Sequence, residues 1–111
     1  MPDDTTSTGE LFRVAESDLE DGRPHRVDRG EHRVAVVRVG DEVFAIGDRC
    51  SHANYSLAEG EIDAEECTLE CWKHGSAFSL RTGEPYTLPA TQPVPVYPVR
   101  IEAGEVVVSL P

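Results

Sequence analysis

The chain has 111 residues and carries 21 Asp and Glu residues against 10 Lys and Arg residues, a formal net charge of −11. This length suits one domain with a modest core and leaves little room for a second domain with a large substrate pocket. An acidic surface repels nucleic acid and anionic membranes, so we expect neither as a partner and favour a basic protein surface instead.

The first ten residues, MPDDTTSTGE, are polar and bury too little apolar surface to offset the entropy of ordering them. We therefore expect a flexible tail over residues 1–10 and one domain over residues 11–111. The start of the chain has no basic and apolar signal pattern, and no apolar run approaches the roughly 18 residues of a membrane span. A cytoplasmic location is the expectation.

The predicted elements are mostly short strands. Ala15–Asp21 is the helix-like candidate, and it is short and followed by Gly22. Gly40-Asp41 suits a two-residue hairpin turn because positive φ costs glycine nothing, and Arg81–Glu84 offers a similar turn. Segments rich in Val and Ile predict strands at Arg33–Val39, Glu42–Ile46 and Glu105–Leu110. Many short strands between turns indicate an all-β barrel or sandwich.

Three cysteines cannot all pair, so reduced thiols or metal ligands are more plausible uses than a disulfide framework. Cys67 alternates with Leu69 and Cys71 at the two-residue period of a strand. We expect Cys67 to be a buried strand thiol and not a metal ligand.

The chemistry lies in two short motifs, Cys50-Ser51-His52 and Cys71-Trp72-Lys73-His74, separated by the eighteen residues from Ala53 to Glu70. Two thiolates and two imidazoles can hold zinc, or a [2Fe-2S] cluster with sulfur on one iron and nitrogen on the other. A zinc knuckle usually takes both cysteines from one turn, whereas each motif here offers one Cys and one His. The mixed motifs favour the cluster, with zinc as the alternative.

These residues resemble the Rieske family, whose members carry Cys-x-His and, after a gap of this order, Cys-x-x-His followed by Gly; here the second element reads CWKHGSAF. The resemblance continues through Thr82-Gly83, Leu88-Pro89-Ala90 and VPVYPV, and spans roughly residues 34–110. Two departures are Trp72, where Pro is common, and a slightly longer gap between the motifs. Neither departure removes a ligand.

The resemblance implies a Rieske-like iron-sulfur domain: an antiparallel β-barrel or sandwich base with a small cluster-binding subdomain formed by two loops. It also implies one [2Fe-2S] cluster, with Cys50 and Cys71 on one iron and His52 and His74 on the other. The rest of the domain would serve as a rigid support for the two loops.

The family's pattern extends to residues around the cluster. Ser76 is expected to hydrogen-bond the cluster, but Phe78 stands where the high-potential branch has a second hydroxyl donor, so we expect a potential toward the lower end of the Rieske range. Trp72 and Pro89 are expected close to the cluster, where Trp72 is a lid or a partner contact. Leu57, Trp72 and Pro89 are expected to form an apolar docking patch, with acidic residues beyond it steering a basic partner.

Respiratory Rieske subunits usually add a second cysteine to each loop, and the corresponding places here look like Tyr55 and Lys73. The chain is therefore similar to the soluble ferredoxins that dock transiently and carry single electrons from a flavin-dependent ferredoxin reductase to an acceptor such as a non-heme iron oxygenase or another redox enzyme. It is not expected to be an enzyme, because an oxygenase also needs a mononuclear iron in a separate large domain. The alternatives are an accessory protein of iron-sulfur cluster assembly and a structural zinc module.

Overall fold

The computed structural model describes residues 11–30, 32–49, 56–72, 75–86 and 92–110. Antiparallel strands and two short 3₁₀ turns make up its regular structure, which confirms the predicted all-β class. The elements in chain order are β1 (Leu11–Ala15), η1 (Glu16–Asp18), β2 (Pro24–Arg29), β3 (His32–Val39), β4 (Glu42–Gly47), η2 (Leu57–Glu59), β5 (Glu61–Asp63), β6 (Thr68–Glu70), β7 (Ala77–Ser79), β8 (Val99–Glu102) and β9 (Glu105–Ser109). The predicted tail over residues 1–10 lies outside the described residues.

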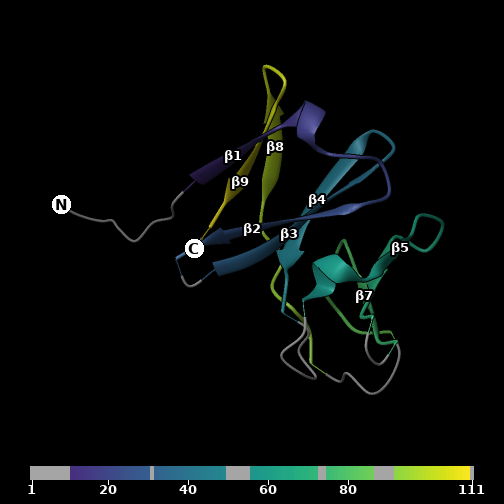
Figure 1. Cartoon of the computed structure of the whole chain (residues 1–111). Coiled ribbons are helices and arrows are strands. Elements are labelled where there is room, and N and C mark those ends of the chain that lie inside the picture. The colour runs from purple at the N-terminus through teal and green to yellow at the C-terminus, as the bar shows by residue number, and fades with distance from the viewer. Residues whose placement is uncertain (1–10, 31, 50–55, 73–74, 87–91, 111) are drawn as a thin grey trace.

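The strands form three sheets of three strands each, in the orders β1-β9-β8, β2-β3-β4 and β5-β6-β7. The first two sheets make the larger part of the molecule, and the β5-β6-β7 sheet sits beyond the lower end of β4 in Figure 1. The β4 strand also approaches the segment before β8, since Gly47 N donates to Pro95 O at 2.8 Å and Tyr97 N donates to Ala45 O at 2.9 Å. This arrangement is a two-sheet base carrying a smaller third sheet.

The middle strand β3 has both faces buried. Its residues Val34 and Val36 pack into the core shared with β1 and β9, whereas Ala35 and Val37 pack into the core shared with the β5-β6-β7 sheet. Alternate residues of a strand point to opposite faces, so an unbroken apolar run is what two cores require. The run Val34–Val37 therefore joins the base to the third sheet through one strand.

The predicted hairpin is confirmed. Its two strands pair antiparallel with Val39 opposite Glu42, and Gly40 has a φ of 61°, the left-handed value that the two-residue turn needs. The helix-like candidate Ala15–Asp21 forms only the short turn η1, because the chain returns to extended backbone at Leu19. Leu19 is buried in the base, and this packing outweighs the weak helical preference of the segment.

The predicted turn over Arg81–Glu84 is also confirmed and joins the third sheet to the base. Ser79 N donates to Glu84 O at 2.9 Å across this turn. Arg81 makes two hydrogen bonds to the Glu42 carboxylate, at 3.1 and 2.9 Å, and its guanidinium carbon lies 5.2 Å from the centre of the Phe44 ring. The start of β4 is thus tied to the end of β7.

None of the helices in the described part of the chain reaches the length and apolar character of a membrane span.

Candidate metal centre

The structure describes the residues that flank both predicted ligand loops. Cys71 lies within the described residues, whereas Cys50, His52 and His74 fall in residues 50–55 and 73–74, which lie outside them. Pro89, expected close to the cluster, falls in residues 87–91 and also lies outside the described part. The geometry that follows is that of the residues immediately before and after the loops.

The second loop is closed by main-chain hydrogen bonds at its base. Cys71 follows β6 directly and is fully buried. The Cys71 N–H donates to Ser76 O at 2.7 Å, and the Gly75 N–H donates to Cys71 O at 3.0 Å. Gly75 has a φ of 77°, which a side chain would disfavour, so glycine is the residue that lets the loop turn back. The Cys71 thiol is therefore set on a tightly fixed backbone.

The first loop is closed in a similar way. An antiparallel bridge joins Arg49 to Ser56, and the Leu57 N–H donates to Asp48 O. The Asp48 carboxylate adds two bonds across the same gap, accepting from Ser56 Oγ at 2.6 Å and from Ala58 N at 2.8 Å. Arg49 and Ser56, which flank residues 50–55, are consequently held side by side.

The end of the first loop and the start of the second lie together. The β5 strand, which follows the first loop through η2, pairs with β6 so that Glu61 lies opposite Glu70. Gly60 packs so closely against this strand that a Cβ placed there would overlap the Glu70 carbonyl oxygen. Leu57 and Cys71 also belong to one buried core. The fold thus brings the residues that flank both Cys-His motifs to one region of the molecule.

A buried charge lies at the base of the first loop. Asp48 is fully buried, and its Oδ2 lies 3.6 Å from Arg26 Nε and 3.8 Å from an Arg33 terminal nitrogen. Arg26 also makes two hydrogen bonds to the Asp28 carboxylate, at 2.9 and 3.3 Å, and these bonds with the Asp28 charge raise the pKa of Arg26. Two cations on β2 and β3 thereby compensate the Asp48 carboxylate.

Asp48 is the site residue that reading the sequence missed. It is a charged residue directly after the apolar strand segment VFAIG and two positions before Cys50, a place where its carboxylate can reach across the loop. That position was a usable signal. Its partners, Ser56, Ala58, Arg26 and Arg33, could not be inferred because they come from three separate segments.

Two expectations are corrected. Leu57 is fully buried in the core below the loops, so it is not part of an exposed docking patch; η2 turns its side chain inward. Cys67 is not on a strand: it lies in the turn before β6 with a φ of 58° and is partly buried. Burial raises the pKa of its thiol. Trp72 is half exposed, which fits a residue at a partner-facing surface.

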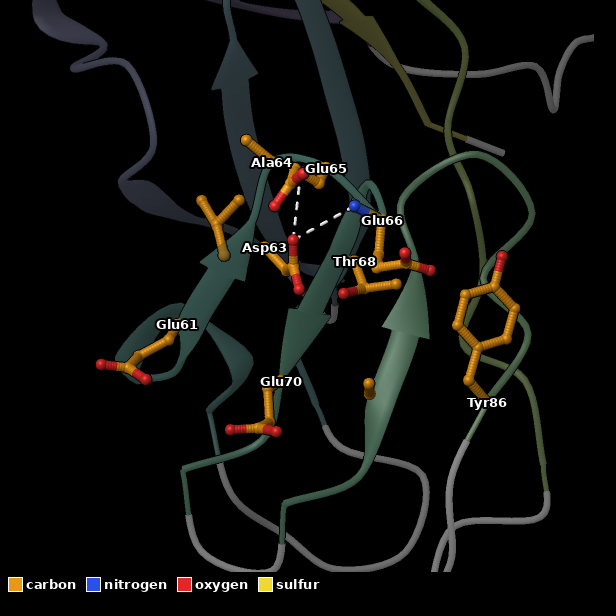
Figure 2. Close-up of a pocket in the computed structure, with 10 residues that line it drawn as sticks. Glu61, Asp63, Ala64, Glu65, Glu66, Thr68, Glu70 and Tyr86 are labelled. Atoms are coloured by element: carbon orange, nitrogen blue, oxygen red, sulfur yellow. Dashed lines mark hydrogen bonds between the residues drawn. The ribbon is translucent and has the colours of Figure 1, made fainter.

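An acidic hollow lies beside the second loop on the β5-β6-β7 sheet. It has a volume of about 640 Å³ and is lined by Glu61, Asp63, Glu65, Glu66, Glu70 and Tyr86, among others. Figure 2 shows these carboxylates around the sheet with the exposed Tyr86 ring at one side. Asp63 has a structural role there, since its Oδ1 accepts from Glu65 N at 3.0 Å and Glu66 N at 3.1 Å.

Of the four expected ligands the described residues include Cys71, and the surroundings of Cys71 suit an iron-sulfur site. A thiolate ligand needs a fixed position and shelter from solvent, and Cys71 has both. Ser76, the expected hydrogen-bond donor, is also fully buried and is joined to Cys71 by the main chain. Asp48 gives the residues that flank the first loop a comparable set of hydrogen bonds.

Comparison with known proteins identifies the family. The family model described as the Rieske [2Fe-2S] domain matches residues 10–98. The 3-phenylpropionate/cinnamic acid dioxygenase ferredoxin subunit of Escherichia coli (strain K12) is 41% identical over 101 residues, which are 91% of this chain and 93% of that protein.

Solved structures agree. The ferredoxin of carbazole 1,9a-dioxygenase from Nocardioides aromaticivorans IC177 has a TM-score of 0.85 at 38% identity, covering 92% of this chain and 97% of that chain. The Sphingomonas yanoikuyae B1 ferredoxin has a TM-score of 0.83 at 33% identity, covering 92% of this chain and all of that one. The family's cofactor is an iron-sulfur cluster, and the fold, the buried thiol and the relatives point the same way: the chain belongs to the Rieske [2Fe-2S] domain family as an electron-carrying ferredoxin.

Proposed function

We propose that Cys50 and Cys71 bind one iron of a single [2Fe-2S] cluster and that His52 and His74 bind the other. The observation that carries this proposal is the buried Cys71 on its hydrogen-bonded loop, in a chain whose residues 10–98 match the family. When bound, such a group takes up and releases one electron without a change of ligands.

The protein's own residues then hold and shelter the site. The main-chain bonds from Cys71 to Ser76 and Gly75 fix the second loop, and Asp48 fixes the first. The Ser76 hydroxyl stabilises added negative charge by donating a hydrogen bond toward the site. Trp72 lies next to Cys71 with about half of its surface exposed, so it can cover the site on one side and meet a partner on the other.

We propose that a flavin-dependent ferredoxin reductase supplies the electron and that a non-heme iron oxygenase accepts it, with catalysis in the oxygenase. The E. coli relative is named as a dioxygenase ferredoxin subunit. A solved complex of reduced oxygenase and oxidised ferredoxin in carbazole 1,9a-dioxygenase contains a chain that is 42% identical, with a TM-score of 0.83 over 89% of this chain and 92% of that one. A cytoplasmic location is part of this proposal, because the free and partly buried thiol of Cys67 suits a reducing compartment.

Redox titration of anaerobically purified protein, followed by electron paramagnetic resonance, tests ligation and potential together. A Rieske-type signal that appears only on reduction, with two irons per chain, is the expected result. Replacing Cys71 by Ser should abolish that signal and the bound iron, because a hydroxyl is a poor ligand for this cluster. Zinc in place of iron and no signal in metal-loaded protein would overturn the proposal in favour of a structural zinc site.

A further inference from the structure

Asp48 is a fully buried carboxylate at the base of the first loop. Moving a carboxylate out of water costs several kcal/mol of free energy. The attraction within a buried ion pair often does no more than offset this cost. A buried ion pair is therefore weak evidence for stability. The more informative feature of Asp48 is the set of residues that its hydrogen bonds hold in place.

The residue ties the two ends of the first loop to each other and to β3. Its main-chain N–H donates to Arg33 O at 2.8 Å, and its main-chain carbonyl accepts from Leu57 N. Its carboxylate accepts from Ser56 Oγ with one oxygen and from Ala58 N with the other. A carboxylate suits this task because it offers two acceptor oxygens in a fixed plane.

The charge of Asp48 is balanced by Arg26 on β2 and Arg33 on β3, while Asp28 accepts hydrogen bonds from Nε and a terminal nitrogen of Arg26. Both arginines are partly exposed, so they offset the buried charge from the solvent side of the base. The result links the β2-β3-β4 sheet, through Asp48, to residues on both sides of the first loop.

We propose that Asp48 is a positioning residue for the metal centre: its carboxylate fixes the residues on either side of the Cys50-Ser51-His52 motif relative to each other and to β3. This inference rests on the proposed function. Outer groups that orient ligands typically alter metal affinity 10- to 100-fold when they are removed. Loss of the Asp48 hydrogen bonds should therefore change both the electronic structure of the bound group and its retention.

The test compares three variants with wild type: Asp48→Asn, Ser56→Ala and the matched control Asp28→Asn. Asp48→Asn keeps the shape but loses one acceptor oxygen, whereas Ser56→Ala breaks one hydrogen bond and leaves the Asp48 charge in place. Asp28→Asn removes a carboxylate from the same arginine without touching the loop. The readouts are the g-values of the reduced protein, its visible circular dichroism and the rate of iron loss to a chelator.

Asp48→Asn and Ser56→Ala should both shift the g-values and speed iron loss roughly 10-fold or more, while Asp28→Asn behaves as wild type. A shift in Asp48→Asn and Asp28→Asn but not in Ser56→Ala would overturn positioning in favour of a charge effect. Wild-type g-values and iron retention in folded Ser56→Ala would also overturn it, even where Asp48→Asn fails to fold. A wild-type protein without a Rieske signal would overturn the proposed function as well.

Discussion

At the scale of single residues, Ser76 carries the hydroxyl that we propose stabilises the reduced site. It is fully buried and its carbonyl oxygen accepts the Cys71 N–H. We expect Ser76→Ala to lower the midpoint potential, because the substitution removes the proposed hydrogen bond that would stabilise the more negative reduced state. A bond of about 1 kcal/mol corresponds to roughly 40 mV for one electron. Protein-film voltammetry measures the shift.

The control for that substitution is Ser79→Ala. Ser79 is also buried, but its Oγ accepts from Arg81 N and Thr82 N in the turn after β7. Ser79→Ala should cost folding stability and leave the potential where it is. Equal potentials in wild type and in the Ser76→Ala protein would contradict the assigned role of the Ser76 hydroxyl.

Cys67 gives a second prediction at this scale. Its turn position, its partial burial and the raised pKa of its thiol make it a poor competitor for iron. Cys67→Ser should therefore retain two irons per chain and an unchanged paramagnetic signal, as measured by iron analysis and resonance spectroscopy. Loss of iron in this variant, with Cys71 intact, would mean that Cys67 takes part in ligation.

At the scale of elements, the contact between Gly60 and β6 positions the two loops. A methyl group at Gly60 would overlap the Glu70 carbonyl oxygen, one residue before Cys71. We expect Gly60→Ala to force η2 and β6 apart, to destabilise the fold by about 1–3 kcal/mol and to lower the iron content of the purified protein. Denaturant unfolding and iron analysis provide the two measurements.

Gly104→Ala is the matched control for Gly60→Ala. Gly104 has a φ of 81° in the turn between β8 and β9, and no atom lies near a Cβ built there. The substitution should cost about 1 kcal/mol through backbone strain alone without loss of iron. Iron loss of the same size in both variants would mean that general instability, and not the Gly60 contact, determines retention.

The Glu42–Arg81 pair links β4 to the turn after β7 and makes that link depend on pH. The Arg81 guanidinium, through its hydrogen bonds and charge, holds the pKa of Glu42 below its usual range. A lowered carboxyl pKa adds stability that is complete above the unfolded-state value of about 4.3 and is lost as pH falls through the folded-state value. Glu42→Gln should thus lower the melting temperature near neutral pH but not in strong acid. Glu84→Gln, which removes a carboxylate from the same turn, should show no such pattern.

Some strands and turns could be predicted from the sequence, whereas the positions of several residues around the site could not. The hairpin around Gly40 and the turn before Glu84 follow from local rules, because glycine and the apolar alternation act over a few residues. Leu57 and Cys67 could not be placed correctly, since a short 3₁₀ turn and a left-handed turn residue break the alternation. The partners of Asp48 depend on the packing of β2, β3 and η2, which no local pattern encodes.

At the scale of the whole molecule, the charge is unevenly placed. Five carboxylates surround one hollow on the β5-β6-β7 sheet. Glu61 and Glu70 lie at the end of the sheet that leads into the second loop, whereas Glu65 and Glu66 lie in the turn at its other end. Arginines, by contrast, concentrate on β2 and at the start of β3, where acidic partners offset them. A basic surface on a partner would therefore meet the face around the second loop first.

This charge pattern predicts how electron transfer to the acceptor responds to salt. The rate for wild type should fall as ionic strength rises, because salt screens attraction between exposed charges. Glu61→Lys with Glu70→Lys, which change the two carboxylates at the end of the sheet that leads into the second loop, should slow transfer at low salt and flatten its salt dependence, as measured by stopped-flow oxidation with the oxygenase. Asp63 is left intact because its carboxylate holds the turn. The control, Asp18→Lys with Glu20→Lys, changes the net charge equally near η1, so an identical effect there would show that total charge, not the face around the second loop, steers the partner.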